Sequence, residues 1–261
     1  MVDFQDGLRK GVFKGLMNSL EQFEADKKAR VAVLTEDLAM RERSRDWMVA
    51  SASHGYTYNF TWLGIPVIQF PQDLVALQEV VWATRPDLIV ETGVAHGGSL
   101  VFSASILELL GGDGRVVGVD IDIRNQNRAR LEAHPLFKRI ELVEGDSVSE
   151  PVVAQVRQLA AGCERVLVIL DSNHTHQHVL SELKLYSPLV KAGGYLVVFD
   201  TSIEEAPDEL FNDKPWGKGN NPMTAVREFL QNNSRFEADD DIEARLQITV
   251  APGGYLKCVA D

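Results

Sequence analysis

The sequence is poor in cysteine and in clustered positive charge, and it has no long apolar run. Its two cysteines, Cys163 and Cys258, lie far apart and indicate neither a disulfide framework nor a cysteine-based metal site. The formal net charge is -12 and no basic cluster stands out, so a nucleic-acid partner is not expected. The apolar runs are shorter than the roughly 20 residues of a membrane helix, and the N-terminus lacks a signal-peptide layout. We therefore expect a cytoplasmic protein without an integral membrane segment.

The first 54 residues differ in pattern from the rest of the chain. Apolar residues recur there at three- and four-residue steps, at Leu8, Val12, Leu16, Leu20 and Phe23. This spacing indicates one stripe of a helix, and a second, more charged helix is expected over residues 26–50. We interpret 1–54 as a helical appendage on a core domain at 55–261, with a substrate lid or a dimer arm as alternatives. An exposed stripe favours a homo-oligomer formed through these helices.

Short apolar runs alternate with helical segments after residue 87. The expected strands are 88–90, 116–121, 140–143, 166–170 and 195–199, with helices at 97–110, 125–133, 149–161 and 176–190. Buried apolar strands separated by helices are typical of a parallel sheet between two helical layers, the doubly wound α/β fold. After a helix at 222–231, the turn residues at 252–254 predict an antiparallel hairpin between 246–250 and 255–259.

Acidic residues follow the successive strands. They are Glu91, Asp120, Asp146, Asp171 and Asp200. Ligands of doubly wound sheets bind at the carboxyl ends of the strands, so these side chains are expected to line one crevice.

The segment after the first strand, "ETGVAHGGS", differs from a dinucleotide-binding fingerprint. Gly93 permits a tight turn, and Gly97 and Gly98 are expected to let the helix start approach a ligand. Ala95 stands where the dinucleotide motif has its second glycine, and the charge of Glu91 would repel a pyrophosphate. A cationic ligand without phosphate suits this acid better, and S-adenosylmethionine is such a ligand. A dehydrogenase is therefore the least favoured function.

Two further strand ends fit the same cofactor. Asp120 lies where a carboxylate accepts hydrogen bonds from both ribose hydroxyls. Gly145, Asp146 and Ser147 follow the next strand, where an acid can accept from the adenine amino group. The expected cofactor-binding set also includes Ala95, His96, Gly97, Ile121 and Asp171.

The last two strand ends predict a metal site. The segment "LDSNHTHQH" places Asp171 at a strand tip with His174 just beyond, and "VVFDTSIEE" places Asp200 at the next tip. Oxygen ligands from adjacent loops suit Mg²⁺, which would lower the pKa of a substrate hydroxyl while His174 accepts its proton. The structural alternatives are that Asp171 caps a helix and that His174 bonds a loop carbonyl. His176 and His178 are expected to belong to the scaffold or the surface.

Several ordered motifs resemble the cephalosporin hydroxylase/rhamnosyl O-methyltransferase family. They include "DLIVETGVAHGGSLVFSASIL", "GVDIDIR", "EGDS", "LDSNHTHQHVLSEL", "GGYLVVFDT" and "NNPMTAVREFL", and the resemblance covers roughly residues 55–260. It implies a class I methyltransferase fold, a Rossmann-like sheet of about seven strands with an antiparallel C-terminal hairpin. It also implies an O-methyltransferase that depends on S-adenosylmethionine and is assisted by Mg²⁺.

The resemblance also implies roles for individual residues. It places Glu91, Gly93 and Ser99 in the segment that holds the methionine moiety of the cofactor. It places Asp120 beside the ribose, and Asp146 and Ser147 beside the adenine. Asp171 and Asp200 fall at the positions of the metal ligands. One departure concerns Phe199, because relatives often have a second acid at this position before Asp200. The metal site is therefore expected to be weaker, to recruit Asn173, Glu204 or Glu205, or to be lost.

Together these observations predict an O-methyltransferase acting on a hydroxyl of a sugar or a small natural product. The polar loop 204–221, which contains Trp216, is a candidate substrate lid, with a mobile surface loop as the alternative. Two other functions stay open. One is an iron-dependent hydroxylase, which needs two histidines and a carboxylate; the other is an inactive cofactor-binding module.

Overall fold

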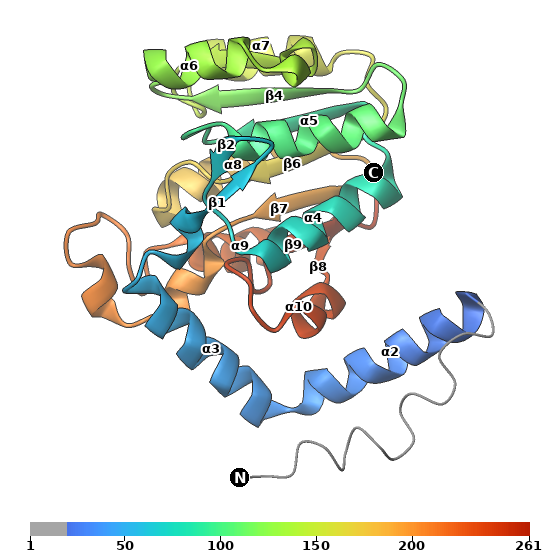
Figure 1. The fold of residues 1–261 in the computed structure, drawn as a ribbon, viewed down its shortest axis with the longest axis vertical. Helices are drawn as coiled ribbons and strands as arrows, with labels where there is room; N and C mark the ends of the chain where they lie inside the picture. The colour runs from blue at the N-terminus through green and yellow to red at the C-terminus, as the bar shows by residue number, and fades with distance from the viewer. Residues whose placement is uncertain (1–19) are drawn as a thin grey trace.

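The computed structural model describes residues 20–261, and a seven-stranded sheet lies at its centre (Figure 1). The strands are β3 (Leu88–Thr92), β4 (Arg115–Asp120), β5 (Ile140–Glu144), β6 (Val166–Leu170), β7 (Tyr195–Val198), β8 (Phe236–Ala238) and β9 (Tyr255–Cys258). Their spatial order is β5-β4-β3-β6-β7-β9-β8. The first five are parallel, whereas β9 runs antiparallel to both β7 and β8. The expected α/β fold with an antiparallel C-terminal pair is confirmed.

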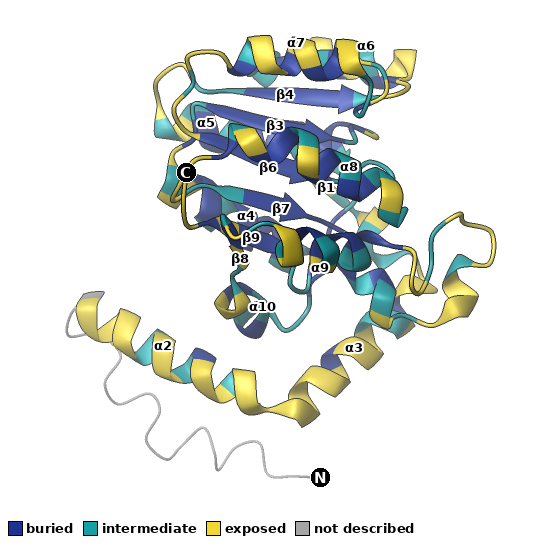
Figure 2. Ribbon diagram, turned by 180° about the vertical axis from the view of Figure 1, so that it is seen from behind, coloured by how far each residue is buried: buried dark blue, intermediate teal, exposed yellow. Residues whose placement is uncertain are grey.

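Helices cover both faces of the sheet (Figures 1 and 2). One face packs against α4 (Pro71–Thr84), α5 (Gly98–Leu110) and α10 (Asp240–Leu246), and the other against α7 (Glu150–Ala160), α8 (His176–Tyr186) and α9 (Pro222–Asn232). The central strand β3 is buried along its whole length because helices cover it on both sides. The shorter elements are α6 (Asn125–Glu132) and the 3-10 turns η1 (Tyr56–Asn59), η2 (Pro135–Arg139), η3 (Ser187–Leu189), η4 (Thr201–Glu205) and η5 (Asp208–Phe211). Within residues 20–261 no helix is long and apolar enough to span a membrane.

Two helices, α2 (Leu20–Glu36) and α3 (Leu38–Ala52), form an N-terminal arm along the edge of the domain (Figure 1). The chain breaks between them because the carboxylate of Asp37 accepts a hydrogen bond from Met40 N (3.0 Å) and caps α3. The prediction of one helix over 26–50 was therefore wrong. Phe23 is 45% exposed, whereas Leu8, Val12 and Leu16 of the predicted stripe lie outside the described residues, so the oligomer contact stays a prediction.

The arm joins the domain through aromatic packing and a short hairpin. Trp47 on α3 contacts the rings of Tyr56 and Phe70. The hairpin, β1 (Phe60–Trp62) with β2 (Ile65–Val67), lies against the start of α5. A Cβ atom on Gly98 would lie 2.2 Å from the carbonyl oxygen of Pro66, so only glycine fits there. This close approach carries the segment after β2 toward the end of β6.

The C-terminal antiparallel pair uses different strands from the hairpin predicted at 252–254. β9 pairs with β8, and the segment 247–250 forms no strand. Asp73, fully buried in α4, accepts hydrogen bonds from Thr249 Oγ1 and from Val250 N. Because this carboxylate binds the segment that would have formed the strand, burial inside the domain overrides the local β pattern.

Candidate active site

Glu91 lies in β3 and is almost completely buried, with 1% of its surface exposed. Ser99, in the first turn of α5, donates a hydrogen bond to Glu91 Oε1, whereas Glu91 Oε2 is buried and has no partner in the described part of the chain. Burial raises the pKa of Glu91 to about 7, and the bond from Ser99 opposes this shift. A ligand with a positively charged donor would satisfy Oε2 and favour the ionised form.

The loop that follows β3 makes the tight turn that the sequence predicted. Its glycines are required by close contacts between segments of the protein. Gly93 (φ 93°) and Ala95 (φ 46°) both adopt positive φ values, and a Cβ on Gly93 would lie 2.0 Å from the carbonyl oxygen of Asp171. A Cβ on Gly97 would lie 2.6 Å from the side chain of Leu131, and Gly98 meets Pro66. Gly97 and Gly98 thus permit close packing between protein segments; both also line the adjacent cavity, and their expected approach to a ligand stays a prediction. His96 is among the residues that line the adjacent cavity.

Asp120, at the end of β4, holds this loop in place. Its Oδ2 accepts from Val94 N (2.8 Å) and Ala95 N (3.3 Å), and its Oδ1 accepts from Asp122 N (3.1 Å). A carboxylate has about four acceptor positions, so it retains capacity for a ribose hydroxyl. The neighbouring Ile121 is 74% exposed and offers an apolar surface beside it.

The segment after β5 divides its side chains between the surface and the interior. Asp146 is exposed, and its Oδ1 accepts from Val148 N (3.1 Å). Ser147 is buried, and its hydroxyl donates to Glu182 (2.6 Å) and lies 3.0 Å from His178 Nε2. The hydroxyl of Ser147 is therefore engaged inside the domain, and its carbonyl oxygen accepts from the hydroxyl of Tyr186 (2.6 Å), so the backbone N–H remains for the predicted adenine site.

Asp171, His174 and Asp200 come together at the ends of β6 and β7. One potential ligand atom from each lies within 4.8 Å of the others, and His174 Nε2 is 3.1 Å from Asp200 Oδ2. Burial raises the pKa of Asp171 well above its usual value, and the charges of Asp200 and Glu91 add to this effect. A divalent cation would offset this repulsion, and two carboxylates with one imidazole are a plausible donor set for it.

The residues predicted as alternative ligands lie elsewhere. Asn173 Oδ1 accepts from the backbone and hydroxyl of Thr175 (2.9 and 2.7 Å). Glu204 accepts from Gly219 N (2.8 Å) and Asn221, and Glu205 is exposed and lies 3.8 Å from Arg45. The third side chain of the cluster is that of His174.

Phe199, the residue before Asp200, faces the core. It is 3% exposed and packs edge-on against Tyr255. This position belongs to the sheet interior, so the next residue, Asp200 (φ 58°), is the one that reaches the cluster.

The other two histidines of this region do not join the cluster. His176 bonds Thr224 (2.8 Å) and Glu228 (3.1 Å), and His178 bonds Ser147 and Ser172. The cluster thus contains one histidine and two carboxylates. An iron-dependent hydroxylase with two histidines and one carboxylate is not supported by this arrangement.

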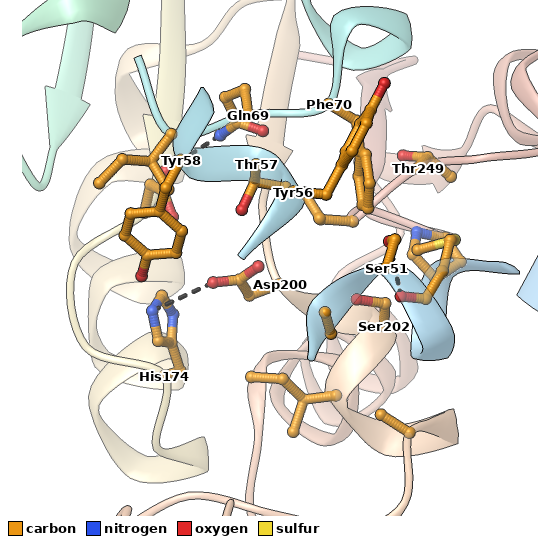
Figure 3. Close-up of a pocket in the computed structure, with 18 of the residues that line it drawn as sticks. Ser51, Tyr56, Thr57, Tyr58, Gln69, Phe70, His174, Asp200, Ser202 and Thr249 are labelled. Carbon is orange, nitrogen blue, oxygen red and sulfur yellow. Dashed lines mark hydrogen bonds and ion pairs between the residues drawn. The ribbon is translucent and has the colours of Figure 1, made fainter. Parts of the chain in front are cut away.

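The cluster opens into a cavity of about 870 Å³ that also reaches the Gly93–Ser99 segment (Figure 3). Residues of α3, η1 and the 204–216 segment form the opposite wall, among them Arg45, Tyr56 and Phe211. Trp216, the predicted lid anchor, packs edge-on against His174, with ring centroids 4.8 Å apart. The N-terminal arm thus contributes directly to the cavity.

Sequence reasoning missed one polar residue in this site. Gln69, two residues after the end of β2, is 5% exposed, and its Nε2 donates to Asp171 Oδ2 (3.2 Å). Figure 3 shows it on the wall above the His174–Asp200 pair. The residue lies in no recognisable motif, and only the contact between β2 and the start of α5 brings it here.

The fold and the strand-end acids define a class I methyltransferase architecture. Residues 54–259 match the rhamnosyl O-methyltransferase/CmcI family, and the chain belongs to this family. The resemblance predicted from the motifs is confirmed.

Similar proteins agree with this assignment. The chain is similar to a rhamnosyl O-methyltransferase of Mycobacterium tuberculosis (strain H37Rv), with 32% identity over 217 residues that cover 80% of this chain and 84% of the relative. The Mycobacterium leprae protein of the same name is 32% identical and is covered to 90%. Among solved structures, CmcI with Mg and SAM has a TM-score of 0.53 at 21% identity, with 78% of each chain covered. A Bacillus cereus O-methyltransferase with SAH has a TM-score of 0.51 at 19% identity and covers 92% of this chain and 100% of its own.

Proposed function

We propose that this protein transfers the methyl group of S-adenosylmethionine to a hydroxyl group of a sugar or a small natural product. The observation that carries the proposal is the cluster of Asp171, His174 and Asp200 on a cavity shared with the loop after Glu91. The relatives named rhamnosyl O-methyltransferase support a sugar as the acceptor.

The cofactor would be held by the loops after β3, β4 and β5. Glu91 would accept from the amino group, because its Oε2 is a buried acceptor without a partner. Asp120 would accept from the ribose, and Ile121 would contact the adenine through its exposed surface. S-adenosylmethionine supplies an activated methyl group on a positively charged sulfur.

The metal would be held by Asp171 and Asp200. Both are acceptors that suit Mg²⁺. Burial and the charges of Asp200 and Glu91 raise the pKa of Asp171, so a bound cation would favour its ionised form. A bound cation would lower the pKa of the acceptor hydroxyl.

His174 would take the proton of the acceptor hydroxyl. An ionised carboxylate only accepts hydrogen bonds, so the 3.1 Å contact with Asp200 places the imidazole proton on Nε2 and leaves Nδ1 as the acceptor. The edge contact with Trp216 helps to fix the ring. Residues of α3 and of the 204–216 segment would orient the acceptor, and orientation is a large source of rate in a displacement of this kind.

Binding and turnover test this function separately. Calorimetric titration with S-adenosylmethionine, S-adenosylhomocysteine and NAD⁺ is expected to show binding of the first two only. Methyl transfer to a panel of glycosides and nucleotide sugars is expected to stop when a chelator removes Mg²⁺ and to return when Mg²⁺ is restored. Binding of NAD⁺ alone would contradict the proposal, and activity that persists with chelator would remove its metal component.

A further inference from the structure

We propose that Gln69 binds the ammonium group of S-adenosylmethionine and thereby links the cofactor to Asp171. This inference rests on the proposed function. Gln69 is buried on the cavity wall, and its Nε2 donates to Asp171 Oδ2 at 3.2 Å. Its other amide atom, Oε1, is buried and has no hydrogen-bond partner in the described residues.

The orientation of the amide follows from its contact with Asp171. The NH₂ group of Gln69 faces Asp171 and donates to Oδ2 at 3.2 Å. Oε1 then necessarily points away from Asp171. A buried carbonyl oxygen without a donor destabilises the free protein, and a ligand that brings a donor relieves this.

Gln69 lies where the two parts of the site meet. In β2, the strand before Gln69, the carbonyl oxygen of Pro66 packs closely against Gly98. Ser99, the residue after Gly98, donates a hydrogen bond to Glu91. The carbonyl oxygen of Asp171 in turn lies against Gly93. Gln69 therefore adjoins both the loop assigned to the cofactor and the carboxylate assigned to the metal.

Two buried oxygen atoms indicate the chemistry of the ligand group. Gln69 Oε1, from a residue on the cavity wall, and Glu91 Oε2 are both acceptors, and neither has a partner among residues 20–261. An ammonium group has three N–H donors and a positive charge, so it can satisfy an amide oxygen and a carboxylate together. A hydroxyl of the acceptor has a single donor and no charge, which fits this pair less well.

The test compares two ligands that differ only in the amino-acid end. S-adenosylhomocysteine has the ammonium group, whereas 5′-methylthioadenosine lacks it. In Gln69→Met we expect the Kd for S-adenosylhomocysteine to rise about tenfold, as for the loss of one charge-assisted hydrogen bond. The Kd for 5′-methylthioadenosine is expected to stay within about twofold. Calorimetry without metal measures both.

Gln72→Met is the matched control. Gln72 also has a buried Oε1 without a partner, but it lies on α4 and is not part of the cavity wall. We expect it to leave both Kd values unchanged. Gln69→Leu repeats the test with a side chain that cannot extend into the cavity as Met can, and thermal unfolding confirms that each variant folds.

Three outcomes would decide against parts of the argument. An equal loss of affinity for both ligands would show that Gln69 only supports the fold, and would overturn the inference. An unchanged Kd for S-adenosylhomocysteine with a higher KM for the acceptor would overturn it too, because the acceptor would then supply the donor. If the unaltered protein binds no S-adenosylhomocysteine, the proposed function itself fails.

Discussion

The two halves of the candidate site are built in different ways. The cofactor half comes from one continuous part of the chain, 91–147, in which each polar residue lies at or just after the end of a strand. The acceptor half combines the ends of β6 and β7 with the 204–216 segment and α3, and Gln69 lies between the two halves. Half of the site is therefore encoded locally, and half depends on contacts between distant segments.

This difference matters because the two halves meet at Asp171. Its carbonyl oxygen lies against Gly93 of the cofactor loop, and its carboxylate accepts from Gln69. Variants on each side of Asp171 are expected to separate binding of the cofactor from chemistry at the acceptor. The expected effects below run from the largest to the smallest.

Asp171→Asn is expected to have the largest effect. The amide binds a cation far more weakly than a carboxylate does, and a loss of several kcal/mol of transition-state stabilisation lowers kcat about a thousandfold. The melting temperature at pH 7 is expected not to fall, because burial and the charges of Asp200 and Glu91 raise the pKa of Asp171 and so disfavour its ionised form. Steady-state kinetics and thermal unfolding measure the two quantities. A variant that loses activity only because it unfolds would contradict this view.

His174→Gln tests the acceptor half without changing its carboxylates. Loss of a general base is expected to lower kcat about a hundredfold. The control is His176→Gln, because His176 bonds Thr224 and Glu228 outside the cluster. If kcat in His174→Gln falls no further than in His176→Gln, His174 is not the base.

Glu91→Gln tests the cofactor half. We expect its affinity for S-adenosylhomocysteine to fall by roughly ten- to a hundredfold, the range for a hydrogen bond to a charged group. The pKa of Glu91 is raised to about 7 in the free protein, and a bound ammonium group favours the ionised form. Binding must therefore release a proton, so the affinity of the unaltered protein is expected to rise from about pH 5 to about pH 7.

Calorimetry across this pH range checks the linkage. The slope is expected to disappear in Glu91→Gln and to persist in Glu144→Gln, whose side chain is exposed and bonds Arg128 at 2.8 Å. The raised pKa of Glu91 also makes the stability of the folded protein depend on pH. Because the folded pKa lies above the unfolded value, the stability from protonated Glu91 is present at low pH and is lost as the pH rises through about 7.

Arg41→Ala on α3 is expected to have the smallest effect. Arg41 forms an exposed ion pair with Glu243 (2.8 Å), and such pairs contribute less than about 1 kcal/mol. Affinity for S-adenosylhomocysteine is expected to stay unchanged, whereas KM for the acceptor rises a few-fold because α3 forms part of the cavity wall. A loss of cofactor affinity would show that the arm also serves the cofactor half.

Much of the cofactor half could be predicted because its signals are local. Glu91, Asp120 and Asp146 lie at or near the ends of strands whose apolar runs are visible in the sequence, and parallel strands bring their carboxyl ends to one edge. The glycines show the limit of that reasoning. Gly97 and Gly98 indicated close approach, but sequence could not show that the approaching groups are Leu131 and Pro66.

The acceptor half could be predicted only in part. Asp171 and Asp200 follow apolar strands and were identified, but the third member of their cluster was sought at Asn173, Glu204 or Glu205 when His174 occupies it. Gln69 has no sequence signal at all. Its position depends on the packing of the β1–β2 hairpin against α5, which no local sequence pattern predicts.

Sequence alone determined the doubly wound sheet, the strand-end acids and the family of this protein. The periodicity of the apolar residues and the order of the elements are visible in the sequence itself. Only the tertiary structure decided which strands form the C-terminal pair, which atoms meet Asp171 and which helices enclose the cavity. Those choices depend on buried polar atoms that must find partners across long sequence separations, as Asp73 does with Thr249 and Gln69 does with Asp171.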